Sequence, residues 1–133
     1  MEIAQMPKPE QIKELMNGPG DTPVVMVNLL RFKDRADGAN EGMSGAESYM
    51  KYGEQMKKFV ESKGGRFIWT GRVDSMLIGE SDADFDVVAL VEYPSRKAFV
   101  EIATSEHVAT IGEDRKMGLE GQWLIATTET SEL

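Results

Sequence analysis

Apolar residues recur along the chain with two different periods, and each period predicts one kind of element. Apolar positions three and four residues apart predict helices at 9–16 and 44–63, and a third helix that Ser95 caps. Ser105 is expected to cap a further helical piece directly afterwards. Alternating or β-branched runs predict strands at 24–32, 66–78, 85–93 and 122–127.

Short local signals refine several of these boundaries. Ser44 and Glu47 have the spacing of a capping box at the start of the long helix. Gly71 interrupts the alternation of its strand and predicts a bulge there. The segment 33–43 mixes charges with glycines, which predicts a mobile surface loop that could act as a lid. The segment 118–121 has glycine at both ends and predicts a turn.

The order of the elements is a short leading helix followed by β-α-β-β-α-β. This order is typical of the ferredoxin-like α+β fold, a four-stranded antiparallel sheet with its main helices on one face. The other face is left uncovered and receives several apolar residues, which predicts a homodimer closed by two facing sheets. We expect an N-terminal helix and linker at 1–21, the ferredoxin-like domain at 22–127 and an acidic tail at 128–133.

Composition narrows the class of protein. The 133 residues are 41% hydrophobic and 29% charged, as in a single globular domain. The net charge of −8 argues against a nucleic-acid partner. The absence of cysteine excludes disulfides, a thiol nucleophile and a zinc knuckle. The N-terminus has no signal-peptide features and no apolar run reaches the ~20 residues of a spanning helix, so we expect a cytoplasmic protein without a membrane partner.

Several segments, taken in order, resemble a known family. They are Val24–Phe32, Tyr49 and Tyr52, Gly64-Gly65-Arg66-Phe67, Glu92-Tyr93-Pro94-Ser95-Arg96 with Phe99, Ser105-Glu106-His107, and Arg115 with Gly118-Leu119. Over about residues 22–127 this pattern resembles the uncharacterised family called domain of unknown function 1330, within the dimeric α/β-barrel superfamily. The resemblance implies homodimers whose sheets enclose a barrel lumen. Many members carry a tyrosine where this chain has His107, and no reaction is implied.

Two residues are candidates for catalysis. His107 is the only histidine, and its ordinary pKa suits a general acid or base at neutral pH. The alternative is a surface histidine at a helix start. Arg115, with Arg72, could hold a carboxylate through paired hydrogen bonds. The alternative for both arginines is an ion pair with an acid such as Glu92 or Asp86.

Four further residues are candidates for substrate binding. Asn28 is the one polar residue in an apolar strand, and a buried amide without a partner costs about 1–3 kcal/mol. It should therefore bond to a neighbour, a water or a ligand. Tyr52 lies on the inner stripe of the long helix, where its ring packs or its hydroxyl reaches a pocket. Trp69 and Trp123 lie on strands and could form a flat wall for a planar ligand, or lie buried at the dimer seam.

No motif supports a metal or a bound cofactor. Asp82, Asp84 and Asp86 have the alternate spacing of a calcium loop, but Val87 and Tyr93 stand where an EF-hand needs glycine and glutamate. Glycine-rich nucleotide motifs are absent, and one histidine cannot form a multi-histidine site.

The sequence leaves two hypotheses about function. In the first, the homodimer binds or transforms a small, partly apolar organic molecule in the barrel lumen without a cofactor. In the second, it is a structural or ligand-binding dimer without chemistry, and the same polar residues pair among themselves.

Overall fold

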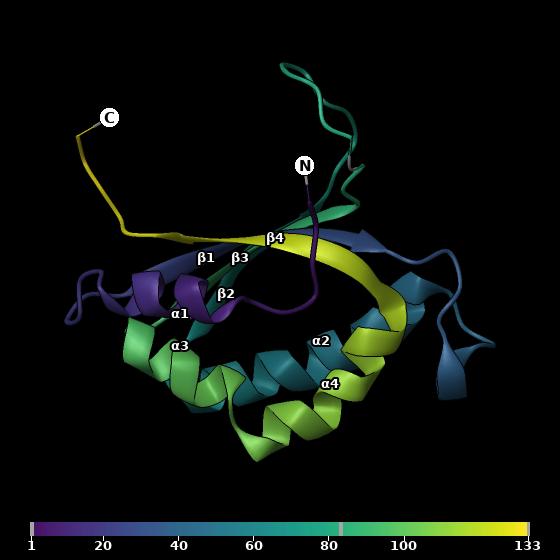
Figure 1. Cartoon of the computed structure of the whole chain (residues 1–133), viewed down its shortest axis with the longest axis horizontal. Helices are drawn as coiled ribbons and strands as arrows, with labels where there is room; N and C mark the ends of the chain where they lie inside the picture. The colour runs from purple at the N-terminus through teal and green to yellow at the C-terminus, as the bar shows by residue number, and fades with distance from the viewer. Residues whose placement is uncertain (1, 83, 133) are drawn as a thin grey trace.

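A four-stranded antiparallel sheet forms the frame of the molecule, and helices pack on one side of it (Figure 1). The computed structural model describes residues 2–82 and 84–132. Its elements in chain order are α1 (Pro9–Met16), β1 (Val24–Phe32), the 3-10 helix η1 (Gly38–Asn40), α2 (Gly45–Ser62), β2 (Arg66–Arg72), β3 (Val87–Tyr93), α3 (Arg96–Ala103), α4 (Glu106–Gly118) and β4 (Leu119–Thr127).

The strand order confirms the ferredoxin-like α+β fold. The strands lie in the order β2-β3-β1-β4, and each neighbouring pair is antiparallel. Helices α2, α3 and α4 begin where capping side chains satisfy free backbone N–H groups. The hydroxyls of Ser44, Ser95 and Ser105 accept from the backbone N–H three residues on, and Glu47 completes the capping box of α2.

Alternation along the strands separates the two faces of the sheet. One face turns its residues towards the helices and forms the core with Val24, Met26, Tyr52, Met56, Val60, Val91, Tyr93, Ile102 and Ile111. The intervening residues turn to the opposite side, which we call the open face. No element of the described chain covers it, and it carries Val25, Val27, Leu29, Trp69, Val88, Leu90, Trp123 and Ile125.

The junction between α4 and β4 differs from the predicted turn. Helix α4 continues to Gly118 and β4 begins at Leu119, with no connecting loop. The glycines here serve close packing. A Cβ atom on Gly118 would collide with the Gly45 carbonyl oxygen, and one on Gly121 would lie 2.8 Å from the Ile3 side chain. Glycine in this sequence therefore marks contact between elements as well as turns.

The segment 33–43 buries more than its composition predicts. Ala36 and Asn40 are buried, and the backbone N–H of Asp37 donates to the Met117 carbonyl at 3.0 Å. The Asn40 amide donates to Ser48 Oγ at 2.9 Å and to Asp114 Oδ1 at 2.7 Å. The prediction of a purely surface loop is wrong, because these bonds tie the segment to α2 and α4.

The predicted second strand is shorter than expected. Strand β2 ends at Arg72, and a long connection leads from there to β3. The bulge lies between Phe67 and Trp69 rather than at Gly71. Gly71 instead lies under the Trp69 ring, since a Cβ atom there would come within 2.6 Å of that ring. Within the described ranges, no helix has the length and apolar character needed to cross a membrane.

We expect Asn40→Ala to lower the free energy of unfolding by about 1–3 kcal/mol, because the buried partners of the amide lose their hydrogen bonds. Urea titration measures the change. The matched control is Glu41→Ala at the neighbouring exposed position, which should stay within about 0.5 kcal/mol of wild type. Equal stability of the two variants would show that the bonds of Asn40 do not hold the segment.

Candidate functional site

The sheet divides the predicted site residues into separate groups. Asn28 of β1 lies on the face that meets the helices, as do Tyr52 of α2 and Arg115 of α4. Trp69 and Trp123 lie on the open face. Within one chain, these five residues therefore cannot line one cavity. The three on the helix side are the group whose contacts point to a binding site.

Arg115 is a partly buried cation without an acidic partner. Its Nη2 donates to the Gln5 carbonyl at 2.6 Å and to Gln122 Oε1 at 3.0 Å. In the described part of the chain no carboxylate pairs with it, and its Nε and Nη1 groups have no hydrogen-bond partner. The ion pair considered from the sequence does not form here. An arginine in this state offers free donors to a ligand anion.

A chain of polar side chains continues from Arg115 across the sheet. Gln122 Nε2 donates to Asn28 Oδ1 at 3.4 Å, and the Asn28 amide nitrogen donates to the carbonyls of Met26 and Ala89, each at 3.2 Å. Asn28 is therefore satisfied within the protein. Sequence reasoning missed Gln122, because its proximity to Asn28 depends on the register of β4 against β1.

Tyr49 and Tyr52 lie near Arg115, and Tyr93, the third tyrosine of the chain, lies near Tyr52. The rings of Tyr49 and Tyr52 meet edge to face at 5.3 Å between centroids. Among the described residues none of the three hydroxyls, including that of Tyr93, makes a hydrogen bond within the protein. Of the described residues, only Thr22 Oγ1 and Arg96 Nε are fully buried side-chain atoms without a hydrogen-bond partner. The tyrosine hydroxyls are not among them and therefore reach solvent.

Burial keeps the tyrosine hydroxyls protonated. Loss of hydration raises the pKa of Tyr49, Tyr52 and Tyr93 above the ordinary tyrosine value. The positive charge of Arg115 acts in the opposite direction on the pKa of Tyr49 and Tyr52, which shows that it lies close to both. At neutral pH the site therefore presents one guanidinium and the hydroxyl donors of Tyr49 and Tyr52.

The edge of the sheet beside this group is open on the helix side. Leu124 pairs with Asn28 in the sheet and shares its face, yet it is 44% exposed. The helices therefore leave this part of β4 uncovered. Residues near the N-terminus pack along the first part of β4. Ala4 pairs with Gln122 there, and Gln5 Nε2 donates to the Leu119 carbonyl at 2.6 Å.

His107 lies apart from this group. It is exposed near the start of α4, and its ring lies 4.4 Å from the Phe59 ring between centroids. The two tryptophans lie on the open face, away from this group. Trp123 packs against Phe85 at 5.0 Å and donates from Nε1 to the Glu2 carbonyl at 2.8 Å. Trp69 is 55% exposed.

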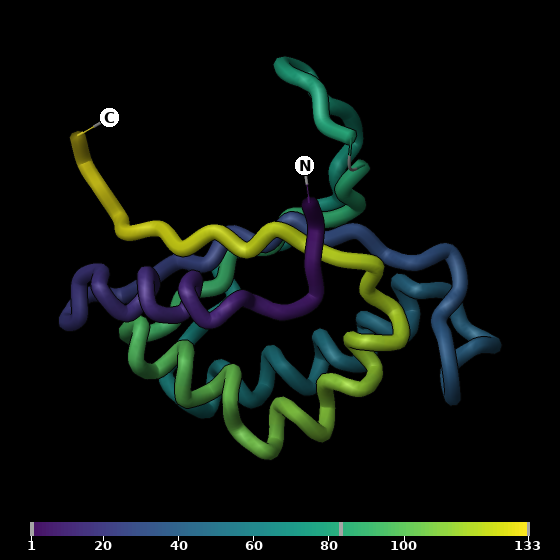
Figure 2. The backbone as a smooth tube through the Cα atoms, in the orientation of Figure 1, coloured from purple at the N-terminus to yellow at the C-terminus, as the bar shows by residue number. Residues whose placement is uncertain are grey.

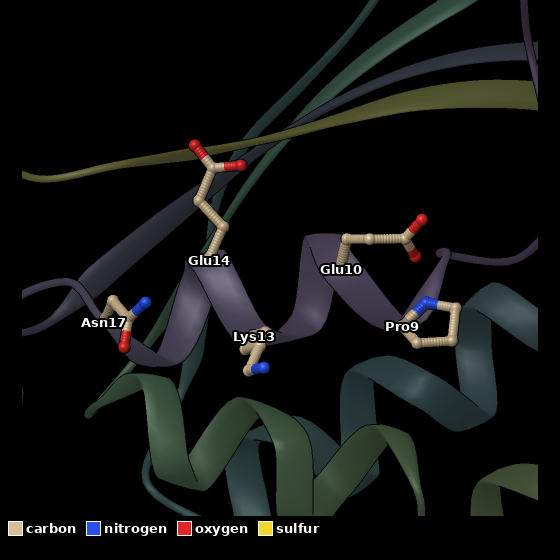
Figure 3. A pocket seen from close by; sticks show the side chains of 5 residues that line it. All are labelled: Pro9, Glu10, Lys13, Glu14 and Asn17. Atoms are coloured by element: carbon tan, nitrogen blue, oxygen red, sulfur yellow. The ribbon is translucent and has the colours of Figure 1, made fainter.

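Two surface pockets of the described residues lie away from all the predicted site residues. Figure 3 shows one of about 450 Å³ on α1, where Glu10 and Glu14 extend to one side and Lys13 to the other. The other, of about 490 Å³, lies at the end of β1 and is lined by Arg31, Phe32, Lys33, Asp34, Asp84, Asp86 and Glu120. Its charges are largely paired internally, as between Arg31 and Glu120 at 2.8 Å. In the described ranges, histidine and acidic residues form no group of three that could hold a metal ion.

Comparison with known proteins agrees with this fold and leaves the function open. A family model described as a domain of unknown function (DUF1330) matches residues 39–128. The crystal structure of RPA0582, a protein of unknown function from Rhodopseudomonas palustris, is similar with a TM-score of 0.87 and 31% identity, covering 98% of this chain and 99% of that one. The crystal structure of the methylated RPA0582 protein has a TM-score of 0.87 at 30% identity, covering 99% of this chain and 98% of that one.

A more distant structure supports the fold alone. A DABB family protein with a ferredoxin-like fold from Mesorhizobium loti has a TM-score of 0.54 at 13% identity, covering 82% of this chain and 98% of that one. Among curated proteins, none matches the chain. The chemistry of the site must therefore be argued from its own residues.

The buried tyrosines should make the protein less stable in alkali. Their pKa values are raised on folding, so the folded state keeps protons that the unfolded state releases above about pH 10. The free energy of unfolding should then fall with rising pH, by about 1.4 kcal/mol per pH unit for each such tyrosine.

The test compares wild type with Tyr93→Phe by urea titration at several pH values. The variant should decline less steeply above about pH 10 and show an unchanged pH dependence between about pH 6 and 9. Identical alkaline slopes would mean that the Tyr93 hydroxyl ionises as easily in the folded protein as in the unfolded one.

Proposed function

Since the chain belongs to the DUF1330 family, which has no defined function, we propose from its own geometry that it is a homodimer binding a small organic acid beside Arg115. The single observation that carries the proposal is a partly buried arginine with free donors and no carboxylate partner. A guanidinium in a protein is always charged, and it binds carboxylates in paired hydrogen bonds. A ligand carboxylate would supply the missing counter-charge.

The surroundings of Arg115 favour a ligand with an apolar body. The rings of Tyr49 and Tyr52 lie near it, and Leu124 extends the apolar surface to the open edge of the sheet. The tyrosine hydroxyls remain donors at neutral pH and suit a second oxygen of the ligand. Together they favour a small aromatic or alicyclic carboxylate over a sugar or a nucleotide.

The same donors define the chemistry that the site supports. Arg115 and the tyrosine hydroxyls can stabilise negative charge on an oxygen. The described residues that hydrogen-bond Arg115 include neither a carboxylate nor an imidazole that could remove a proton, and His107 is exposed near the start of α4 beside Phe59. The site therefore fits binding, or polarisation of a ligand oxygen, better than proton abstraction.

The open face supports the homodimer. Trp69 is 55% exposed and Ile125 is 46% exposed on a face that otherwise carries mainly apolar side chains. Monomeric proteins seldom leave a contiguous apolar face of this kind in water. A second copy covers it with an identical face, as a two-fold interface requires.

A second candidate function is a dimer without a ligand. It is favoured by the bonds of Asn28, whose amide nitrogen reaches two backbone carbonyls and whose oxygen accepts from Gln122. In that case the polar chain specifies packing only. Ligand titration separates the two candidates.

We expect benzoate or cyclohexanecarboxylate to bind, and benzamide to bind at least about tenfold more weakly, because charge-assisted hydrogen bonds contribute about 1.5–3 kcal/mol. Arg115→Met should lower carboxylate affinity about tenfold or more. Amide chemical shifts in a nuclear magnetic resonance titration measure both effects. The control is Arg72→Met, which should bind like wild type. Arg72 is exposed, and its Nε lies 3.6 Å from Asp74 Oδ1.

Two results would count against the binding site. One is the absence of saturable shifts with every carboxylate up to millimolar concentration. The other is equal affinity of wild type and Arg115→Met, with melting curves that show both folded.

For the homodimer, light scattering at micromolar concentration should give about twice the chain mass of 14.8 kDa. Leu90→Glu should dissociate the dimer, since it places a charge without a partner in the middle of the open face. Circular dichroism shows whether the variant still folds. Met50→Glu, at an exposed position on α2, is the control and should remain dimeric. A wild-type mass of 14.8 kDa would contradict the homodimer.

A further inference from the structure

The connection between β2 and β3 exposes three consecutive apolar residues. Met76 is 57% exposed, Leu77 is 92% exposed and Ile78 is 87% exposed. We call these three residues the arm tip. Gly79 follows with a positive φ of 90°, a conformation that suits glycine and turns the chain back towards β3. Leu77 and Ile78 thus contribute almost nothing to the packing of their own chain.

The arm tip lies on the same side of the molecule as the open face. In Figure 2 the connection stands out from the sheet on the side away from α2, α3 and α4. A partner that covers the open face therefore meets the arm as well. Because large apolar side chains in full contact with water are unfavourable, the arm tip is best explained by a surface that buries it.

Charge favours a protein partner over a membrane. Asp74 and Glu80 flank the arm tip, and the whole chain carries a net charge of −8. Acidic residues next to an apolar tip are repelled by the anionic lipids of a membrane surface. A second copy of the chain instead offers arginines on strand β2: the Arg66 side chain, paired with Glu92 at 2.6 Å, is still 66% exposed, and that of Arg72, whose Nε lies 3.6 Å from Asp74 Oδ1, is 85% exposed.

The area of the open face also leaves room for the arm in the interface. Four strands spaced ~4.8 Å apart, with about seven residues each at ~3.3 Å per residue, give a face of roughly 450 Å². A stable interface buries about 800 Å² on each partner. The arm adds contact surface beyond the edge of the sheet.

We propose that the arm tip docks on a second copy of this chain, so that each protomer of the dimer buries Met76, Leu77 and Ile78 against its partner. The inference rests on the proposed homodimer and assigns part of its stability to the arm. By two-fold symmetry both arms make the same contact, and a substitution in the arm acts twice.

The first test is the double variant Leu77→Ser with Ile78→Ser. It should raise the dissociation constant of the dimer at least about tenfold, measured by sedimentation across a dilution series. Its urea denaturation as a monomer should match wild type, because both side chains are exposed within the chain. Met50→Ser, at a 56% exposed apolar position on α2, is the matched control and should dimerise like wild type. An unchanged dissociation constant in the double variant overturns the proposal.

The second test uses the absence of cysteine in the chain. In the variant Leu77→Cys the new thiol is labelled with an environment-sensitive fluorophore. The variant Met50→Cys, labelled in the same way, is the control. The emission at 77 should shift to the blue as the dimer forms and return on dilution, while the emission at 50 stays constant.

The other outcomes of this labelling separate the arm from the dimer. A dimer in which the label at 77 remains as exposed as that at 50 overturns the arm contact and leaves the homodimer standing. A chain that stays monomeric at all concentrations overturns both. A blue shift that appears only with phosphatidylcholine vesicles containing phosphatidylserine shows a membrane-binding tip and also overturns the proposal.

Discussion

The close contact between α2 and α4 determines the positions of Tyr49, Tyr52 and Arg115, the helix side of the site. At the crossing, a Cβ atom on Gly45 or Gly118 would collide with backbone oxygen atoms, so only glycine permits this approach. Ser48 is completely buried there and donates to the Asp114 carbonyl at 2.8 Å. The Lys33 N–H donates to the Gly118 carbonyl at 2.9 Å, which joins the crossing to the end of β1. Helix and sheet are thus held together at the point from which Arg115 extends.

Arg115 is partly buried, and its hydrogen bonds inside the protein reach neutral oxygens only. Taking part of a guanidinium out of water is unfavourable unless its donors find acceptors. Two acceptors are neutral oxygens, the Gln5 carbonyl and Gln122 Oε1, and neither supplies a negative charge. The charges of Arg31 and Arg66 are compensated by carboxylates, since each pairs with a glutamate on a neighbouring strand at 2.8 Å or less. This contrast within one sheet distinguishes Arg115 from the structural arginines.

Local signals predicted the fold well and the site only in part. Ser44, Ser95 and Ser105 each act on the next turn of chain, so their sequence context is sufficient to place the helix starts. The strand alternation likewise put Asn28 on the same face as its buried neighbours. What the sequence could not show is the register between distant strands, which brings Gln122 to Asn28 and separates both from Trp69. The partners of Arg115 depend on tertiary packing for the same reason.

The direct passage from α4 to β4 limits how this chain can tolerate insertions and deletions. Since no loop separates Gly118 from Leu119, one added or lost residue must shift the helix or the strand itself. Strand β4 already contains one irregularity, since Gly121 and Leu119 pair with Arg31 and Phe32 while Glu120 is left over. A one-residue slip beyond it would exchange the two faces of the strand and send Gln122 to the open side. Length changes among relatives of this fold should therefore collect in the β2–β3 connection rather than at this junction.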